Sequence, residues 1–197
     1  PATAQKFNGI VALLLLLIAC FIPAWIISAI LAKLDSGWII EALIATAFLA
    51  QKSLRQHVRQ VFVGLGHSLA EGRRAVSMIV GRDTTRLDES GVSRAALESL
   101  AENTADGVVA PALWYALLGL PGLVLYKAIN TADSMIGHKT PRHLAFGWAA
   151  ARIDDLANLI PARLTGLLFA ATSPNAPAAF GCMVRDAGKH RSPNAGW

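Results

Sequence analysis

Acidic and amide side chains follow one another at helical spacing in the segment "ESLAENTADGVVAP" (98–111), directly before a long apolar run. Glu98, Glu102 and Asp106 are four residues apart, so a helix would place them on one face. Carboxylates beside lipid are costly and usually face a cavity, a partner or an ion. The spacing therefore predicts one wall of a polar site. An ordinary polar helix face at the membrane surface is the alternative, above all for Glu98, because Arg94 lies one turn away.

Two further polar groups occur later in the chain, again beside apolar residues. Asn130 and Asp133 are three residues apart and would share a helical face, and Asp154, Asp155 and Asn158 form the second group. Oxygen ligands at such spacing suit Mg²⁺, which keeps several waters and bridges to substrate phosphates. We therefore take Asp133, Asp154 and Asp155 as candidate magnesium ligands. A polar helix face is again the alternative.

The segment "GRDTTRLDE" (81–89) offers Arg82 and Arg86 as clamps for phosphate or carboxylate groups. The planar guanidinium group binds both in a bidentate manner. A charged loop with local ion pairs is the alternative. No GxxxxGK[ST] motif occurs, so any ATP site is not a P-loop. The histidines after residue 130 are scattered, and each is interpreted as a surface or interface residue.

The composition is that of a membrane protein or of an unusually apolar core. Hydrophobic residues make up 54% of the chain and charged residues 16%, and the mean hydropathy is +0.45. Residues 9–32 are apolar over a length that crosses a bilayer core of about 30 Å. Residues 38–50 are also apolar, but this stretch is short and carries Glu41. Together they predict a transmembrane hairpin over 9–50.

Basic residues outnumber acidic ones between 51 and 94. By the positive-inside rule this part faces the cytoplasm, and the net charge of +5 is interpreted as an orientation signal, with no nucleic acid as partner. We expect 51–107 to form a cytoplasmic basic segment and an acidic helix with Ser90 or Ser93 as its N-cap.

Apolar helices that carry the polar clusters are expected over 108–171. The sequence "GLPG" (119–122) interrupts the first of them and predicts two half-helices in a re-entrant hairpin. The expected fold class is therefore all-α, a multi-pass membrane helical protein with a re-entrant helical hairpin. We expect a single membrane-embedded domain over 1–197. Because the chain starts at Pro1, it is expected to be part of a longer one.

Five strings occur in a specific order: GRDT, ENTADG, NTADSMIG, FGWAAARIDDLAN and SPNAGW. Their combination resembles the adenosylcobinamide-phosphate synthase family, the CobD/CbiB proteins of cobalamin biosynthesis. The resemblance covers residues 77–168 closely, together with 192–197. The string "GHKTPRH" (137–143) departs from the usual family pattern, and family members extend further at both ends.

The resemblance implies a multi-pass inner-membrane enzyme with a cytoplasmic active face. Such an enzyme joins adenosylcobyric acid, a corrinoid, to (R)-1-aminopropan-2-ol or its O-phosphate in an amide bond, with ATP as co-substrate and Mg²⁺ as cofactor. Implied partners are the lipid bilayer and other enzymes of cobalamin assembly. This chemistry needs charge neutralisation at phosphates and a base for the amine, which matches the residue types found.

The resemblance also suggests roles for the polar residues, which are expected to converge at the cytoplasmic mouth of the re-entrant hairpin. The expected catalytic residues are Glu102, Asp106, Asp133 and Asp155, and Asp154 joins Asp133 and Asp155 as a magnesium ligand. The expected substrate- and phosphate-binding residues are Arg82, Asp83, Arg86, Asn103, Asn130, Asn158 and Arg163.

Two other functions are left open by the sequence. Acidic motifs on membrane helices also suit a magnesium-dependent prenyl-diphosphate transferase, although no clean pair of NDxxD or DDxxD motifs is present. A non-catalytic membrane sensor or transport component is the third possibility, although a transporter should show inverted repeats.

Overall fold

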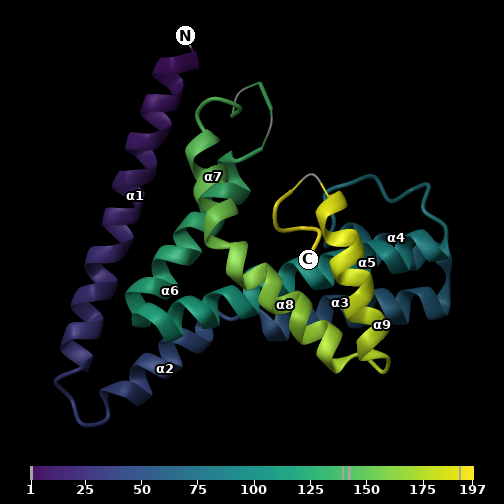
Figure 1. Cartoon of the computed structure of the whole chain (residues 1–197), viewed down its shortest axis with the longest axis horizontal. Coiled ribbons are helices and arrows are strands. Elements are labelled where there is room, and N and C mark those ends of the chain that lie inside the picture. The colour runs from purple at the N-terminus through teal and green to yellow at the C-terminus, as the bar shows by residue number, and fades with distance from the viewer. Residues whose placement is uncertain (1, 139, 142, 191) are drawn as a thin grey trace.

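The computed structural model describes residues 2–138, 140–141, 143–190 and 192–197. These residues form helices and connecting turns without any strand, so the predicted all-α class is confirmed (Figure 1). The elements are α1 (Ala2–Leu31), α2 (Gly37–Ala47), α3 (Gln51–His67), α4 (Leu69–Ser77), α5 (Glu89–Thr104), the π-helical turn η1 (Ala105–Val109), α6 (Ala110–Ile136), α7 (Trp148–Ala157), α8 (Leu159–Thr172), α9 (Ala176–Asp186) and the 3-10 turn η2 (Ala187–Lys189).

Helix α1 forms a hairpin with α2 and packs against α6 and α7. One side of α1 is buried, where Leu13 meets Ala132 and Ala150. The rest carries exposed apolar side chains such as Trp25, which is 57% exposed. Two helical stretches, Ala2–Leu31 and Glu89–Ile136, have the length and the apolar composition to cross a membrane. The exposed apolar surface of α1 suggests membrane association.

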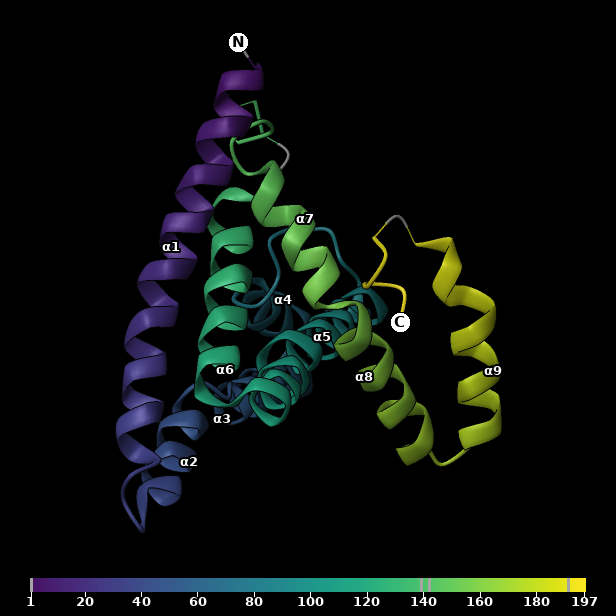
Figure 2. The ribbon, with the colours of Figure 1, turned by 60° about the vertical axis from the view of Figure 1, so that its left-hand side comes forward.

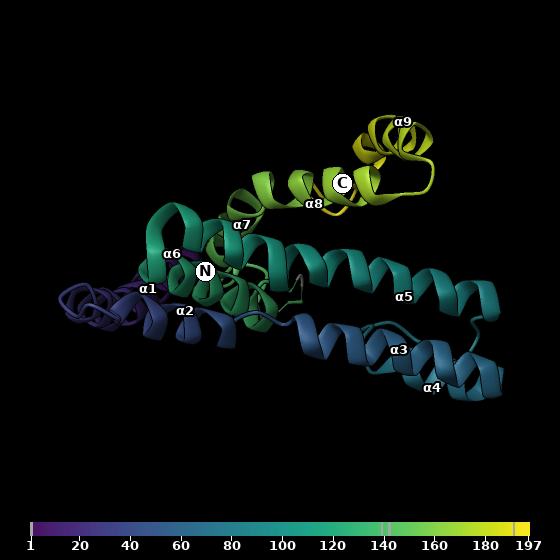
Figure 3. The same cartoon turned by 90° about the horizontal axis from the view of Figure 1, so that it is seen from below.

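Helices α3, α4 and α5 pack around a separate core. Val61, Val76 and Val92, one from each helix, are fully buried there. Helices α3 and α4 lie together on one side of α5 (Figure 3). The expected N-cap of α5 was wrong: Asp88 accepts a hydrogen bond from the Gly91 backbone N–H, and the helix starts at Glu89, ahead of both predicted serines. Aspartate is as good an N-cap as serine, and here it comes first in the chain.

Helix α5, the π-helical turn η1 and the first half of α6 continue as one long rod (Figure 3). The rod ends at Gly119, whose backbone has φ 66° and ψ −158°. A residue with a side chain would be strained in this conformation. Pro121 then starts the second half of α6, and Leu120 and Leu123 are buried against Ala45 of α2. The break that the sequence predicts at 119–122 is thus present. Its re-entry into a membrane stays a prediction.

Helices α7, α8 and α9 form the other side of the molecule. Helix α7 runs beside α6 and leads directly into α8, and α9 folds back along α8 (Figure 2). The last described segment, residues 192–197, returns to α8, where the Trp197 backbone carbonyl comes close to Gly166 (Figure 2). A Cβ at Gly166 would lie only 2.6 Å from that oxygen, so glycine permits the approach. The C-terminal segment therefore lies beside α8.

Candidate functional site

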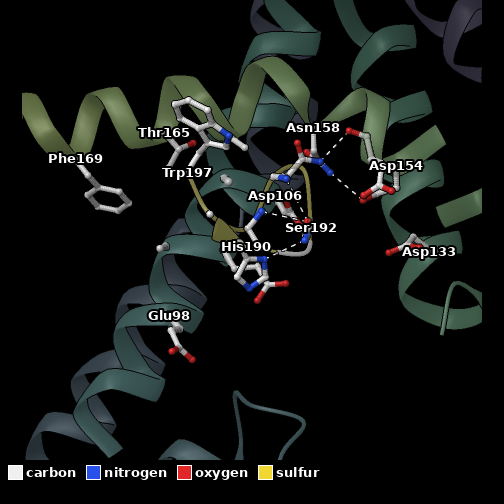
Figure 4. Close-up of a pocket in the computed structure, with 18 residues that line it drawn as sticks. Glu98, Asp106, Asp133, Asp154, Asn158, Thr165, Phe169, His190, Ser192 and Trp197 are labelled. Atoms are coloured by element: carbon white, nitrogen blue, oxygen red, sulfur yellow. Dashed lines mark hydrogen bonds between the residues drawn. The ribbon is translucent and has the colours of Figure 1, made fainter. Parts of the chain in front are cut away.

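A cavity of about 540 Å³ lies between α5, η1, the second half of α6, the α7–α8 junction and the C-terminal segment. A cavity of this size suits a small ligand. Figure 4 shows its polar side chains, with Asp106, Asp154 and Asn158 close together and Glu98 at the far end. Six carboxylates line it: Glu98, Glu102, Asp106, Asp133, Asp154 and Asp155.

Helix geometry places three of these carboxylates along one wall. Glu98 and Glu102 are one turn apart on α5, and Asp106 follows in η1, so the four-residue steps seen in the sequence do lead into one cavity. A π-helical turn holds one residue more than an α-helical turn, so η1 also resets the register of α6 relative to α5. The predicted polar wall is present.

A hydrogen-bonded group beside the cavity joins η1, α6 and the α7–α8 junction, and its members Asn130 and Tyr126 do not line the cavity themselves. The Asn130 side-chain amide lies 3.4 Å from Asp106 Oδ2 and 3.4 Å from Asp154 Oδ1. The Asn158 amide nitrogen donates to Asp154 Oδ2 at 3.0 Å. The hydroxyl of Tyr126, which is 1% exposed, donates to Asn158 Oδ1 at 2.9 Å. These contacts place the Asn130 amide between two carboxylates and the Asn158 amide between Asp154 and Tyr126.

The electrostatics of the cavity favour a cation. Burial, and next the charge of Asp133, raise the pKa of Asp154 to about 6, while the amides of Asn158 and Asn130 act in the opposite direction. Among the described residues, Asp106, Asp133 and Asp154 take part in no ion pair, and Asp155 has only a 3.5 Å pair with the exposed Arg152. Half-buried carboxylates that form no ion pair attract an amine or a metal ion.

The donor set fits magnesium in chemical type. Carboxylate and amide oxygens are its preferred protein ligands, and it usually takes one or two carboxylates and completes its shell with water and phosphate. The described part of the chain holds no group of three or more His, Cys, Asp or Glu side chains already arranged around a metal position. Asp133, Asp154 and Asp155 line the same cavity, and their role as magnesium ligands stays a prediction.

The C-terminal segment supplies residues that sequence reasoning missed. His190, Ser192, Asn194 and Trp197 line the cavity, and His190 is also exposed, as expected for a surface residue. The Asn194 side-chain amide donates to the Asp155 carbonyl at 2.8 Å, which ties the segment to α7. The string SPNAGW, one of the strings that carry the family resemblance, was the available signal for Ser192, Asn194 and Trp197.

Arg163 and Asn103 lie outside the cavity. Arg163 donates to the Leu159 carbonyl at 2.7 Å and stacks on the Trp197 ring at 4.6 Å, so it supports the cavity wall from behind. The Asn103 amide donates back to the Ser99 carbonyl at 2.8 Å and faces a different hollow beside α3. Glu98 and Glu102 lie on the face of α5 that borders the cavity. Asn103 lies on the adjacent face of the helix and therefore points away from the cavity.

The arginine loop before α5 reaches the site only at its edge. Arg82 pairs with Glu98 at 2.5 Å, and both side chains are about half exposed. Asp83 accepts hydrogen bonds from the backbone and side chain of Thr85, which lower its pKa. Arg86 is exposed and does not line the cavity. Of Arg82, Asp83 and Arg86, Arg82 alone is paired with a cavity residue in the described part of the chain.

Comparisons with known proteins place the chain in one family. The family model described as CobD/Cbib protein matches residues 1–197. A protein named Cobalamin biosynthesis protein CobD from Sinorhizobium fredii is 56% identical over 200 residues, which cover 98% of this chain and 61% of that protein. A protein of the same name from Rhodobacter capsulatus is 58% identical over 168 residues, which cover 83% of this chain and 54% of that protein. Another from Brucella suis is 53% identical over 205 residues, which cover 100% of this chain and 63% of that protein.

The chain thus spans about three fifths of the length of the first of these curated relatives. No solved structure matches it. The family resemblance seen in the ordered strings from GRDT to SPNAGW is confirmed by the match over the whole chain. The chain belongs to the CobD/Cbib protein family.

Proposed function

We propose that this chain carries the site of an ATP- and magnesium-dependent amide-forming ligase of cobalamin biosynthesis, an adenosylcobinamide-phosphate synthase. The reaction joins adenosylcobyric acid to (R)-1-aminopropan-2-ol or its O-phosphate. Two findings support the proposal: the family and its relatives named for cobalamin biosynthesis, and the carboxylate-lined cavity. The longer relatives contain residues that this chain does not, and they are expected to add to the same site.

The convergence of six carboxylates in one cavity carries the proposal. An amine substrate arrives as a cation, and Asp106, Asp133 and Asp154 have no ion-pair partner among the described residues to satisfy them first. A cavity of about 540 Å³ suits the amine, a carboxylate side chain and phosphate groups, and we expect the corrin ring to stay outside it. The site therefore suits the reacting ends of the two substrates.

The reaction needs the corrinoid carboxylate to be activated. Its oxygen attacks the γ-phosphorus of ATP, ADP leaves, and an acyl phosphate results. The amine nitrogen then attacks the acyl carbon and phosphate leaves. Magnesium, when bound, neutralises charge on the transferred phosphoryl group.

The chain's own residues bind, orient and move protons in this scheme. A carboxylate of the cavity takes the proton that the amine must lose before it attacks. Asn130 and Asn158 hold the carboxylates in place through the contacts described above. Arg82, at the edge of the cavity beside Glu98, is in reach of a phosphate that enters from that side. Arg163 acts through the Trp197 ring that it supports.

We further propose that the protein is a multi-pass inner-membrane protein with this cavity on the cytoplasmic side. The two long apolar helical stretches and the exposed apolar surface of α1 support membrane insertion. The excess of basic residues in α3, α4 and the following loop supports the cytoplasmic orientation. Cysteine accessibility in intact spheroplasts, with single cysteines in α3, tests the orientation.

The reaction is tested by following the mass of the corrinoid. The purified chain and a version extended to the length of its relatives are each mixed with adenosylcobyric acid, aminopropanol phosphate, ATP and Mg²⁺. The expected result is a mass gain equal to condensation, at least from the extended version, that requires both ATP and Mg²⁺. No gain from either version overturns the proposal. Thermal stabilisation by an isoprenoid diphosphate in place of the corrinoid would favour a prenyl transferase.

Two cavity variants link the reaction to the site. Asp133→Asn and Asp155→Asn are expected to reduce turnover at least a hundredfold, because each removes a charge from the cavity. Glu71→Gln is the matched control, since Glu71 is an exposed carboxylate in α4 that does not line the cavity. Full turnover in folded Asp133→Asn and Asp155→Asn proteins would show that the cavity is not the site.

A further inference from the structure

A groove runs between α3 and α5 on the side of α5 that faces away from the carboxylate cavity. It measures about 630 Å³, and its walls are mainly apolar, with Leu54, Val58 and Phe62 from α3 facing Leu100 and Val108. Phe62 at its end is 79% exposed. No residue of this groove lines the carboxylate cavity. The groove is a second concave feature without a role in the proposed reaction.

Basic side chains line one edge of this groove. Arg55 and Arg59 belong to its wall, and Lys52 joins them in the adjoining hollow on the same helix. The positions 52, 55 and 59 share one face of α3. Within the described residues none of the three forms an ion pair, and all three are exposed. The edge therefore presents three unpaired positive charges beside an apolar channel.

The groove continues onto the apolar helices. The Ala50 backbone N–H donates to the Gly107 carbonyl at 2.9 Å, so the start of α3 is fixed to η1, where Val108 lines the groove. Helix α2 ends just before this point, and the stretch Glu89–Ile136 runs through it. An apolar ligand in the groove can thus extend along surfaces of membrane-spanning composition.

We propose that this groove binds an anionic phospholipid of the surrounding membrane. One acyl chain lies between α3 and α5, and the phosphate rests on Arg55 and Arg59 with Lys52 beside them. The charges match an anionic headgroup, and the apolar channel matches an acyl chain. A nucleic acid or an acidic peptide would match the charges alone and would leave the apolar channel unfilled. The site is separate from the proposed reaction.

The test uses the full chain in detergent with a dansyl-labelled phosphatidylglycerol, and follows energy transfer from the protein's tryptophans. We expect saturable binding that weakens with salt, and much weaker binding of dansyl-phosphatidylcholine. Arg55→Gln with Arg59→Gln is expected to weaken binding about thirtyfold, because each basic group near an anionic lipid contributes about 1 kcal/mol. Arg74→Gln with Arg94→Gln makes the same charge change outside the groove and should leave binding unaltered.

A second variant tests the apolar half of the groove. Val58→Phe narrows the channel while every charge and every tryptophan donor is kept, and it should weaken phosphatidylglycerol binding at least about tenfold while circular dichroism shows the native helix content. Equal binding of the two lipids, or equal loss in the control pair, overturns the proposal. So does displacement of the lipid by polyglutamate or an oligonucleotide as effectively as by unlabelled phosphatidylglycerol, because charge alone would then explain the binding.

Discussion

Tyr126 and Asn158 connect the second half of α6 to the junction of α7 and α8. The Tyr126 hydroxyl donates to Asn158 Oδ1 at 2.9 Å, and both residues are buried. The amide of Asn158 is thereby oriented with its nitrogen towards Asp154, to which it donates at 3.0 Å. A residue that does not line the cavity thus decides which group of Asn158 faces the carboxylates.

Tyr126→Phe removes the donor and leaves Asn158 Oδ1 buried without it. We expect a loss of about 1–2 kcal/mol in the free energy of unfolding, because an unsatisfied buried acceptor carries its desolvation cost. Melting in detergent measures the change. A double-mutant cycle with Asn158→Leu should show a coupling of at least about 0.5 kcal/mol. Additive effects would mean that the hydrogen bond does not hold this junction.

The raised pKa of Asp154 predicts that the stability of the protein depends on pH. Because its pKa in the folded protein is raised to about 6, the folded state binds more protons than the unfolded state between about pH 4 and pH 6. Its contribution to stability is therefore present at low pH and is lost as the pH rises through 6. Asp154→Asn should gain stability relative to the wild type between pH 4.5 and pH 7. A constant difference over this range would contradict the prediction.

Gly119 has a backbone conformation that glycine alone adopts without strain, and we predict that substitution there is destabilising. Gly119→Ala is expected to lower stability by about 1–2 kcal/mol, because its φ of 66° strains any side chain, although the nearest heavy atom is 3.7 Å from a Cβ there. Gly181→Ala in α9 is the matched control, since nothing lies within 4 Å of its Cβ and its backbone is helical. That substitution should be neutral or stabilising. Chemical denaturation of the two variants separates the cases.

We predict that substitution of Arg82 weakens phosphate binding and leaves the stability of the protein nearly unchanged. Its ion pair with Glu98 joins side chains that are 51% and 56% exposed, so Arg82→Gln should change the free energy of unfolding by less than about 1 kcal/mol. If Arg82 receives phosphate at the cavity edge, the KM for ATP rises while kcat changes less. Arg74→Gln serves as the comparison, because Arg74 is exposed in α4. An unchanged KM would remove Arg82 from the site.

The sequence predicts the local features of this fold well. The all-α class, the apolar helix near the N-terminus and the break at "GLPG" follow from composition and from the backbone preferences of glycine and proline. The shared face of Glu98, Glu102 and Asp106 follows from helical geometry. These features depend on neighbouring residues alone.

Features that depend on distant residues could not be predicted in this way. Nothing in the spacing of Asn194 reveals its hydrogen bond to the Asp155 carbonyl, and Arg163 stacks on Trp197 only because the chain returns to α8. The π-helical turn after Thr104 is also invisible in the letters, since its residues fit an α-helix equally well. Long-range packing decides all three.

The extra residue in η1 makes this turn unusually tolerant of a one-residue deletion. A π-helical turn takes one residue more than an α-helical turn, so removing one residue between Ala105 and Val109 would restore an ordinary helix and keep α5 and α6 close to their present relative rotation. Glu98 and Glu102 would still face the cavity. The same deletion between Pro111 and Leu117, where the helix is an ordinary α-helix, would instead rotate Glu98 and Glu102 by about 100° relative to Asp133. A pair of frame-preserving deletions in the gene can therefore change the alignment of the carboxylates while every one of these side chains remains in the protein.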